Sequence, residues 1–315
     1  MNHQRQITMA YNNTIAEVSQ VLTSILDETF QQASKTAMWA ADPNVVRGFQ
    51  NAKTGQIATI KVSGMGDYNP AKGFPEGLAS MTLEDYVLRY DRGVSYLLDQ
   101  VDVMQAAGIP TASAVLAEFS RSALVPEVDA VRIASVASSA ITGGKSKSYT
   151  PAKATILSEI TEALQSIEDA TGVDSGINIL VNQKYGGILK ASTEVTRMKD
   201  IESSAMVINN KIASINDNPV TYVPSARMYS EFDLKDGVAG TMEGAGFAPS
   251  ADAKEVVAVF SVPGAVQGIV AHNIQKVISP EMNPDADGTK LAFRVYHDCI
   301  VPKNKVPGVF AIVTP

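Results

Sequence analysis

The first segment of the chain shows the apolar periodicity of an amphipathic helix. Thr14 and Glu17 form a capping-box pattern, in which each side chain satisfies a free backbone N–H at the start of a helix. One apolar stripe then recurs at three-to-four spacing: Ile15, Val18, Val21, Leu22, Ile25, Leu26 and Phe30. A helix near a chain terminus must bury such a stripe, so we expect it to pack either on its own body or on a neighbouring molecule.

Two alternating runs predict a pair of strands joined by a long loop. Apolar residues occupy alternate positions over 58–62 and again over 86–90. Residues 63–77 lie between the runs, and they are far more numerous than the two to five residues of an ordinary hairpin turn. A two-stranded ribbon is only marginally stable alone in water, so this one needs support, either as a lid over a site or as an arm on a partner.

Two helices follow along the chain. The longest helical pattern covers 112–142, and Pro126 inside it predicts either a kink or two consecutive helices. A second helix is predicted from Thr150, as its N-cap, with Pro151 at the first helical position. Gly172 marks its end.

From about residue 177 the pattern changes to short strands and turns. Strands are predicted over 177–182, 256–262, 268–271 and 292–301. The second of these is nearly all apolar, which indicates a strand buried on both faces. A further helix is predicted over 194–210, and residues 224–249 form a loop rich in glycine, proline and serine that is too long to be a plain connection.

Composition narrows the function classes. The 315 residues are 45% hydrophobic and 19% charged, as in globular proteins, and no apolar run approaches the roughly 18 residues that span a bilayer. No apolar signal core follows the first residues, so we expect no export signal. A net charge of −7 argues against tight, sequence-specific binding to nucleic acid. One cysteine allows no internal disulfide, and three histidines leave little material for a histidine-rich metal site.

Two motifs imitate ligand-binding loops but lack an essential residue. The tripeptide Gly-Lys-Ser at 144–146 resembles the end of a phosphate-binding loop, yet Ser139 stands where that loop needs a glycine. Residues 283–288 resemble the first half of a calcium loop, but the twelfth position is Arg294, which would repel the ion. We therefore expect a solvated turn between two helices at the first site and a polar turn at the second.

A third motif places a base, an acid and a thiol in a row at His297, Asp298 and Cys299. Neighbours in a strand point to opposite faces, so His297 and Cys299 share one face and Asp298 faces away. A nucleophile, its base and an orienting group must converge, which this trio cannot do unaided. The expectation is a protein that is not an enzyme, with no catalytic, metal-binding or cofactor-binding residues and no cofactor. The alternative is a hydrolase in which residues 63–77 form a lid over a site near His297.

Several strings, in their order along the chain, resemble strings of one protein family. They are VPEVDA at 125–130, VPSARM at 223–228, PDAD at 284–287, FRVYHD at 293–298 and VPKNKVPGV at 301–309. Together with the N-terminal helix, the long projection and the long central helix, they make residues 56–313 similar to the major capsid proteins of tailed double-stranded DNA bacteriophages. That family shares its fold with bacterial encapsulin shells. Val131 stands where the family commonly has an aromatic residue.

The resemblance implies an α+β phage major capsid fold with a defined order of domains. These are an N-terminal arm at 1–55, an E-loop at 56–95, a P-domain with a long spine helix at 96–142, an A-domain at 143–273, P-domain return strands at 274–301 and a final A-domain strand at 302–315.

The resemblance also implies a structural function. Copies of the chain would assemble into pentamers and hexamers of an icosahedral shell that encloses the viral double-stranded DNA genome, in the virion and, during assembly, in the host cytoplasm. Its partners would be other copies of itself, with a separate scaffolding protein, a portal and a decoration protein as further partners that the family allows. Contact with the packaged DNA would be non-specific, and no membrane is involved. An encapsulin-like compartment, which holds an enzyme instead of DNA, is the alternative with the same fold.

The expected assembly contacts lie in three places. In the E-loop tip they are Met65, Tyr68, Lys72 and Phe74; in the N-terminal arm, Leu22, Leu26, Phe30 and Trp39; in the A-domain loop, Arg227, Met228 and Tyr229.

Overall fold

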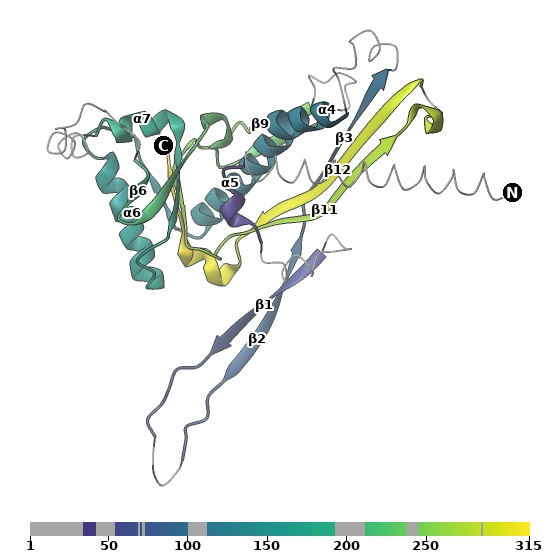
Figure 1. Cartoon of the computed structure of the whole chain (residues 1–315). Coiled ribbons are helices and arrows are strands. Elements are labelled where there is room, and N and C mark those ends of the chain that lie inside the picture. The colour runs from purple at the N-terminus through teal and green to yellow at the C-terminus, as the bar shows by residue number, and fades with distance from the viewer. Residues whose placement is uncertain are drawn as a thin grey trace.

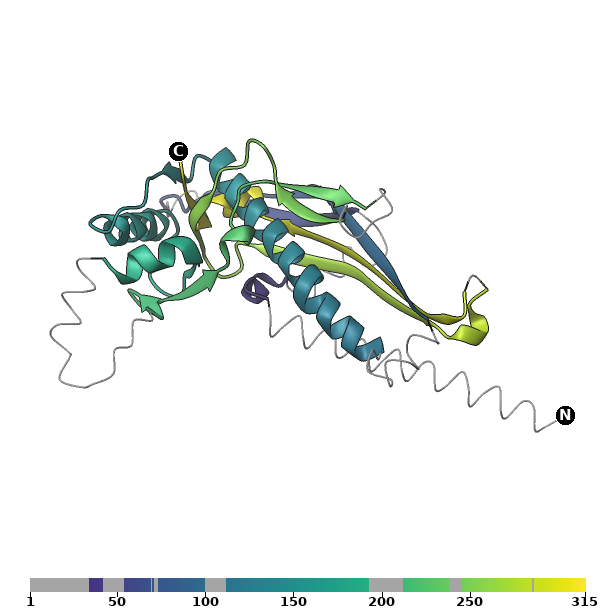
Figure 2. The same ribbon diagram turned by 90° about the horizontal axis from the view of Figure 1, so that it is seen from above.

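The computed structural model describes residues 34–41, 54–68, 70, 73–99, 112–192, 212–237, 245–284 and 286–315. Figures 1 and 2 show a body with helices packed around a sheet, a second sheet crossed by a long helix, and a thin two-stranded ribbon that projects away from both. The helices predicted over 14–30 and 194–210 lie outside the described residues.

The larger sheet has six strands in the order β4-β13-β10-β5-β7-β6. Their bounds are β4 Ser146–Ser148, β5 Asn178–Asn182, β6 Ser214–Ile215, β7 Asn218–Val223, β10 Val256–Ser261 and β13 Val309–Val313. Helices α6 (Ile156–Thr171) and α7 (Gln183–Lys190) cover one face, and α5 (Val125–Thr142) covers the other. Because both faces are covered, every residue of β10 is buried, as its apolar run predicts.

The second sheet is antiparallel and has the order β11-β12-β3. Its strands are β3 Tyr90–Asp99, β11 Gln267–Ile278 and β12 Gly288–Ile300, so the strands predicted over 268–271 and 292–301 are both longer than expected. Helix α4 (Ala112–Phe119) packs on this sheet, where Phe119 stacks on Phe293 with ring centroids 5.3 Å apart.

The long helix runs through a π-helical turn. Helix α4 continues into a π turn at Ser120–Leu124 and then into α5, whose first turn contains Pro126. Proline has no N–H to donate and its ring collides with the carbonyl one turn earlier, and the extra residue of a π turn relieves both problems. The predicted helix over 112–142 is therefore confirmed, but at Pro126 the helical run continues through a π turn and does not end to give two separate helices.

The projecting ribbon consists of β1 (Thr54–Val62) and β2 (Ala79–Val87), paired antiparallel with Ile60 opposite Met81. The first predicted strand is confirmed as part of β1, but the second is wrong as one strand, because the alternating run at 86–90 spans the end of β2 and the start of β3. The ladder breaks there because Leu88 turns into the body and the Arg89 N–H bonds to Asp298 instead of to a strand.

Two boundaries differ from the predictions. Helix α6 begins after Thr155, not after Thr150, because the hydroxyl of Tyr149 accepts from the Ala152 N–H and lies 2.8 Å from Thr155 Oγ1, which holds the preceding residues in a loop. Its end at Gly172, in the left-handed conformation with φ 70°, is confirmed. The expected loop at 224–249 contains a hairpin, β8 (Phe232–Asp236) and β9 (Ala245–Pro249).

Candidate assembly surface

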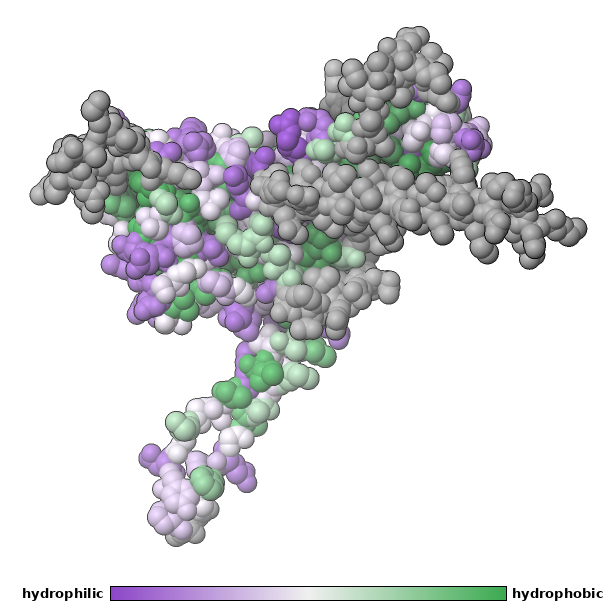
Figure 3. Space-filling model, in the orientation of Figure 1, coloured by the Kyte–Doolittle hydropathy of each residue, from purple (hydrophilic) through white to green (hydrophobic). Residues whose placement is uncertain are grey.

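Over 58–62 and 79–83, the outer part of the ribbon, one face is apolar and the other is polar. Strand residues alternate in direction and cross-strand partners share a face, so the register of β1 and β2 sorts the side chains. One face carries the apolar set Ala58, Ile60, Val62, Ala79, Met81 and Leu83. The reverse face carries Thr59, Lys61, Ser80, Thr82 and Glu84. Ile60 and Met81, opposite each other, are 68% and 65% exposed, so this face is left open by the residues that the structure describes (Figure 3).

The tip of the ribbon is also apolar and exposed. Met65 is fully exposed and Phe74 is 87% exposed, while Tyr68 contacts Phe74 with ring centroids 5.1 Å apart. Lys72 lies outside the described residues. Large apolar side chains that are exposed together in this way mark a site where proteins associate.

The base of the ribbon is fixed to the body. Leu88 lies in a small apolar cluster with Ile269 and Ile300, and partly buried Ile57 and Tyr86 pack against them. Arg89 bonds to the buried carboxylate of Asp298 and donates to Ser135 Oγ of α5 at 3.2 Å. The ribbon is therefore an arm that is anchored to the body at its base and that exposes apolar side chains beyond this base.

Residues 34–41, the described part of the expected N-terminal arm, lie against the body. The side chain of Trp39 is only 2% exposed, and its Nε1 donates to Ser261 Oγ at 2.7 Å. The expectation that Trp39 contacts a neighbouring subunit is therefore wrong, because its side chain belongs to the core of its own subunit. Leu22, Leu26 and Phe30 lie outside the described residues.

The expected A-domain contacts also lie mostly inside the subunit. Met228 is fully buried, which contradicts the expectation that its side chain meets a neighbour. Arg227 pairs with the buried Asp129 at 2.9 Å, so its guanidinium is engaged within the subunit. Tyr229 is half-buried, with its ring edge against Phe232 at 5.9 Å between centroids, so part of its side chain stays accessible.

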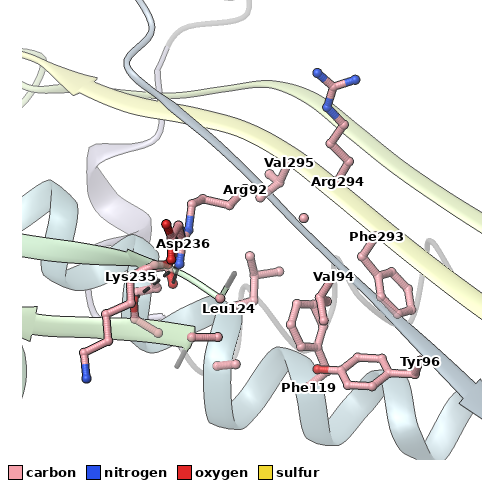
Figure 4. A pocket seen from close by; sticks show the side chains of 16 residues that line it. Arg92, Val94, Tyr96, Phe119, Leu124, Lys235, Asp236, Phe293, Arg294 and Val295 are labelled. Atoms are coloured by element: carbon pink, nitrogen blue, oxygen red, sulfur yellow. Dashed lines mark hydrogen bonds and ion pairs between the residues drawn. The ribbon is translucent and has the colours of Figure 1, made fainter. Parts of the chain in front are cut away.

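A groove of about 500 Å³ lies between the second sheet, the junction of α4 and α5, and the β8–β9 hairpin (Figure 4). Val94, Phe119 and Phe293 give it an apolar lining. Arg92 lies at its edge, where it bonds to Glu127 at 2.6 Å and donates to the carbonyl of Lys235 at 2.7 Å. Among the described residues, the lining contains no histidine, cysteine, serine or threonine, so the groove can bind an apolar group but offers no nucleophile of those types.

The motif at 297–299 is divided as its strand predicts. His297 and Cys299 point into the core, and Asp298 points to Arg89. Burial lowers the pKa of His297 to about 4 and raises that of Cys299 to about 12, so near neutral pH the imidazole is uncharged and the thiol is protonated. The arrangement that the hydrolase alternative requires, with residues 63–77 as a lid over a site near His297, is not the one observed, because the ribbon points away from the body and His297 is buried (Figure 1).

The other two motifs are turns. Gly144, with φ 66°, makes the turn from α5 into β4, so this turn joins a helix to a strand and not two helices as expected. Asn283 donates to the carbonyl of Gly288 at 3.1 Å and closes the second turn. Across the residues that the structure describes, no group of three histidine, cysteine, aspartate or glutamate side chains could hold a metal ion, and no helix has the length and apolarity to cross a membrane.

Comparison with known proteins gives a result at the level of structure only. Neither a protein-family model nor a curated protein sequence matches the chain. The mature capsid of bacteriophage PhiM1 is similar, with a TM-score of 0.56 and 14% identity over 85% of this chain and 86% of that one. The capsid of cyanophage P-SCSP1u gives 0.55 and 8% identity, covering 88% of both chains. A virus-like particle from Pyrococcus furiosus gives 0.53 and 9% identity, covering 95% of this chain and 100% of that one.

The chain has the phage major capsid fold. The fold class expected from the strings is thereby confirmed, and at these identities the likeness extends to the fold alone. Within that fold, sequence reasoning missed the residues that hold the outlying segments: Arg89 and Arg92 from β3 and its approach, and Asp129 from α5. One signal was present, since Asp129 is a charged residue in the middle of the apolar stripe of a long helix.

Proposed function

We propose that this chain is the major capsid protein of a tailed double-stranded DNA bacteriophage, and that its copies form the pentamers and hexamers of an icosahedral shell around the genome. One observation carries the proposal: on a chain with a capsid fold, the ribbon exposes large apolar side chains along one face, at Ile60, Val62, Met81 and Leu83, and at its tip, at Met65 and Phe74. Among the residues that the structure describes, none covers these side chains, and another copy of the chain is the cover that a self-assembling shell provides.

The energetics favour association. Covering a large apolar side chain contributes on the order of 1–2 kcal/mol, and the ribbon exposes several, including Ile60, Met81 and Phe74. A single contact of this size is weak, but a closed shell repeats it in every subunit and makes each contact support the next.

The same proposal extends to the domains and partners. We keep the division into arm (1–55), E-loop (56–95), P-domain (96–142 and 274–301) and A-domain (143–273 and 302–315). It is supported by the six-stranded sheet, all of whose strands fall within the two A-domain segments. The chain would act without cofactor or catalysis, in the virion and first in the host cytoplasm. It would meet scaffolding, portal and decoration proteins, and would touch packaged DNA non-specifically.

A second shell function is supported by the likeness to the virus-like particle from Pyrococcus furiosus. A compartment of the same fold would hold a protein cargo in place of DNA. The apolar ribbon suits either shell, so the contents of the particle distinguish the two.

The test is direct. Purified chain, alone or with a scaffolding protein, should elute as capsomers or particles and show closed shells by electron microscopy; a persistent compact monomer would contradict both shell functions. Particles from infected cells should protect double-stranded DNA from nuclease if the genome-shell proposal holds. Replacing residues 63–77 by a short turn should abolish shells while the body keeps its thermal unfolding transition.

A further inference from the structure

Asp129 lies at a junction of three segments that are far apart in sequence. It belongs to α5, and its side chain is fully buried. Its carboxylate accepts hydrogen bonds from Ser34 Oγ at 2.7 Å and from Thr36 Oγ1 at 2.7 Å, and the Lys35 N–H donates to it at 2.9 Å. On the other side, Arg227 Nη1 donates to it at 2.9 Å. A single carboxylate therefore joins residues 34–36, helix α5 and the loop at 225–227.

The 34–41 segment is held along its length. Arg132, one turn further along α5, donates to the carbonyl of Thr36 at 3.2 Å, and the Ala41 N–H donates to the carbonyl of Gly268 in β11 at 3.0 Å. Gly268 permits this approach, since a Cβ there would lie 2.9 Å from the carbonyl oxygen of Trp39. Ser34, the first residue that the structure describes, is therefore held at one defined point beside Asp129.

The loop at 225–227 is tied to the six-stranded sheet. Arg227 ends a single 3-10 turn, and the next residue, Met228, is buried in the core. The carbonyl of Met228 accepts from the Val256 N–H at the start of β10 at 2.9 Å. Arg227 is therefore held in a fixed position relative to the six-stranded sheet through the residue that follows it.

A buried carboxylate is stable only when its acceptor sites are filled, and here no single segment fills them. Loss of the Arg227 donor leaves a buried charge held by the 34–36 side alone, which weakens the whole junction. Residues 34–36 and the loop at 225–227 are therefore coupled through the Asp129 carboxylate, and this coupling does not require direct contact between them.

Resting on the proposed function, we propose that Asp129 is a positioning residue for shell assembly: it fixes residues 34–36 relative to the 225–228 loop. A neighbour that contacts either of these two segments then acts on both. The carboxylate is the shared element, and Arg227 is its charge partner.

The experiment measures tryptic cleavage after Lys35, whose side chain is exposed, in the unassembled protein. Arg227→Gln, a change in the distant loop, should raise the cleavage rate by about tenfold, because a charge-assisted hydrogen bond is lost at the junction. Arg227→Lys keeps the charge and should restore most of the protection. Arg121→Gln removes an exposed ion pair with Glu118 in the adjoining π turn and should change nothing.

Asp129→Asn should give the same increase as Arg227→Gln, and combining the two should add little further, because both break the same junction. If Arg227→Gln folds with the thermal transition of the parent protein and leaves cleavage after Lys35 unchanged, the coupling is overturned. If cleavage rises but Arg227→Gln builds shells at the parent yield, the role in assembly is overturned. Since cleavage is read before assembly, failure of the parent chain to form shells at all would instead contradict the proposed function.

Discussion

Arg89 donates hydrogen bonds to Asp298 from both its backbone and its side chain. The Arg89 N–H and Nε each donate to Asp298 Oδ2 at 3.0 Å, and Nη2 donates to Oδ1 at 3.0 Å. Asp298 is buried, and its hydrogen bond to Arg89 raises the pKa of that guanidinium. These bonds stand where the β2 ladder stops and the β3 ladder begins, so they set the direction in which the ribbon leaves the body.

Removing this carboxylate should destabilise the subunit. Asp298→Ala leaves the Arg89 N–H and guanidinium without their acceptor, and we expect a loss of roughly 2–3 kcal/mol in the free energy of unfolding. Asp91→Ala is the matched control, because it breaks an exposed pair with Arg294 in the same sheet and should cost less than about 1 kcal/mol. Denaturant titration measures both, and equal losses would contradict the special weight given to Asp298.

The two faces of the ribbon should respond differently to charge. Met81→Asp places a carboxylate on the apolar face, and we expect shell yield to fall by at least about tenfold, because a covered charge must be desolvated. Thr82→Asp places the same group one residue on, on the polar face, and should leave assembly intact. Sedimentation and electron microscopy give the yields. Both variants should keep the parent's unfolding free energy within about 0.5 kcal/mol, because both sites are exposed.

His297 should make stability fall in mild acid. Burial, assisted by nearby Arg132, lowers its pKa from 6.5 to about 4. Between these values the unfolded chain binds a proton that the folded chain does not, so the free energy of unfolding decreases as pH falls from about 6.5 to about 4, by roughly 3 kcal/mol in all. Below about pH 4 both states are protonated and this contribution stops changing.

The comparison with His297→Phe isolates this effect from the titration of carboxylates. The variant keeps a ring beside Tyr90, which stacks on His297 at 5.7 Å, and has no imidazole to titrate. Relative to the parent, its unfolding free energy should rise by roughly 2 kcal/mol between pH 7 and pH 4.5. If the free energies of unfolding of the two proteins follow parallel pH profiles, His297 is not the cause of the loss of stability in acid.

Gly268, which lies against residues 39–41, should tolerate a methyl group poorly. A Cβ there would lie 2.7 Å from Arg132 Nε and 2.9 Å from the Trp39 carbonyl oxygen, so Gly268→Ala should cost roughly 2–3 kcal/mol. Gly187→Ala is the control, since the site in α7 has nothing within 4 Å, and it should be neutral or stabilise by up to about 1 kcal/mol. Thermal unfolding decides, and a mild effect at Gly268 would mean that residues 39–41 move aside easily.

Local sequence patterns were sufficient to predict the elements that depend on their own residues and not on a distant partner. The alternation at 58–62 identified β1, the nearly all-apolar run at 256–262 identified buried β10, and Gly172 marked the end of α6, since each depends on its own strand or turn. The β8–β9 hairpin was missed because its sequence is that of a loop and Arg92, from a distant strand, holds its backbone.

Burial at the expected contacts was less predictable. Trp39 and Met228 are large apolar residues in irregular segments, which suits a surface contact as well as a core position. Distant partners decide between the two: Ser261 receives the indole N–H of Trp39, and Asp129 fixes the residue before Met228. Neither partner is visible from sequence spacing, because each lies roughly a hundred residues or more away.

The polar reverse of the ribbon limits how far association can go. Lys61, Ser80 and Thr82 are exposed polar residues on that side, whereas Thr59 is buried, so a subunit whose apolar face is covered presents a hydrated surface at these three positions. In the proposed shell, association through the apolar face alone would extend the wall sideways without adding a second layer. Such a wall would be one molecule thick, as the alternation of apolar and polar residues in β1 and β2 requires.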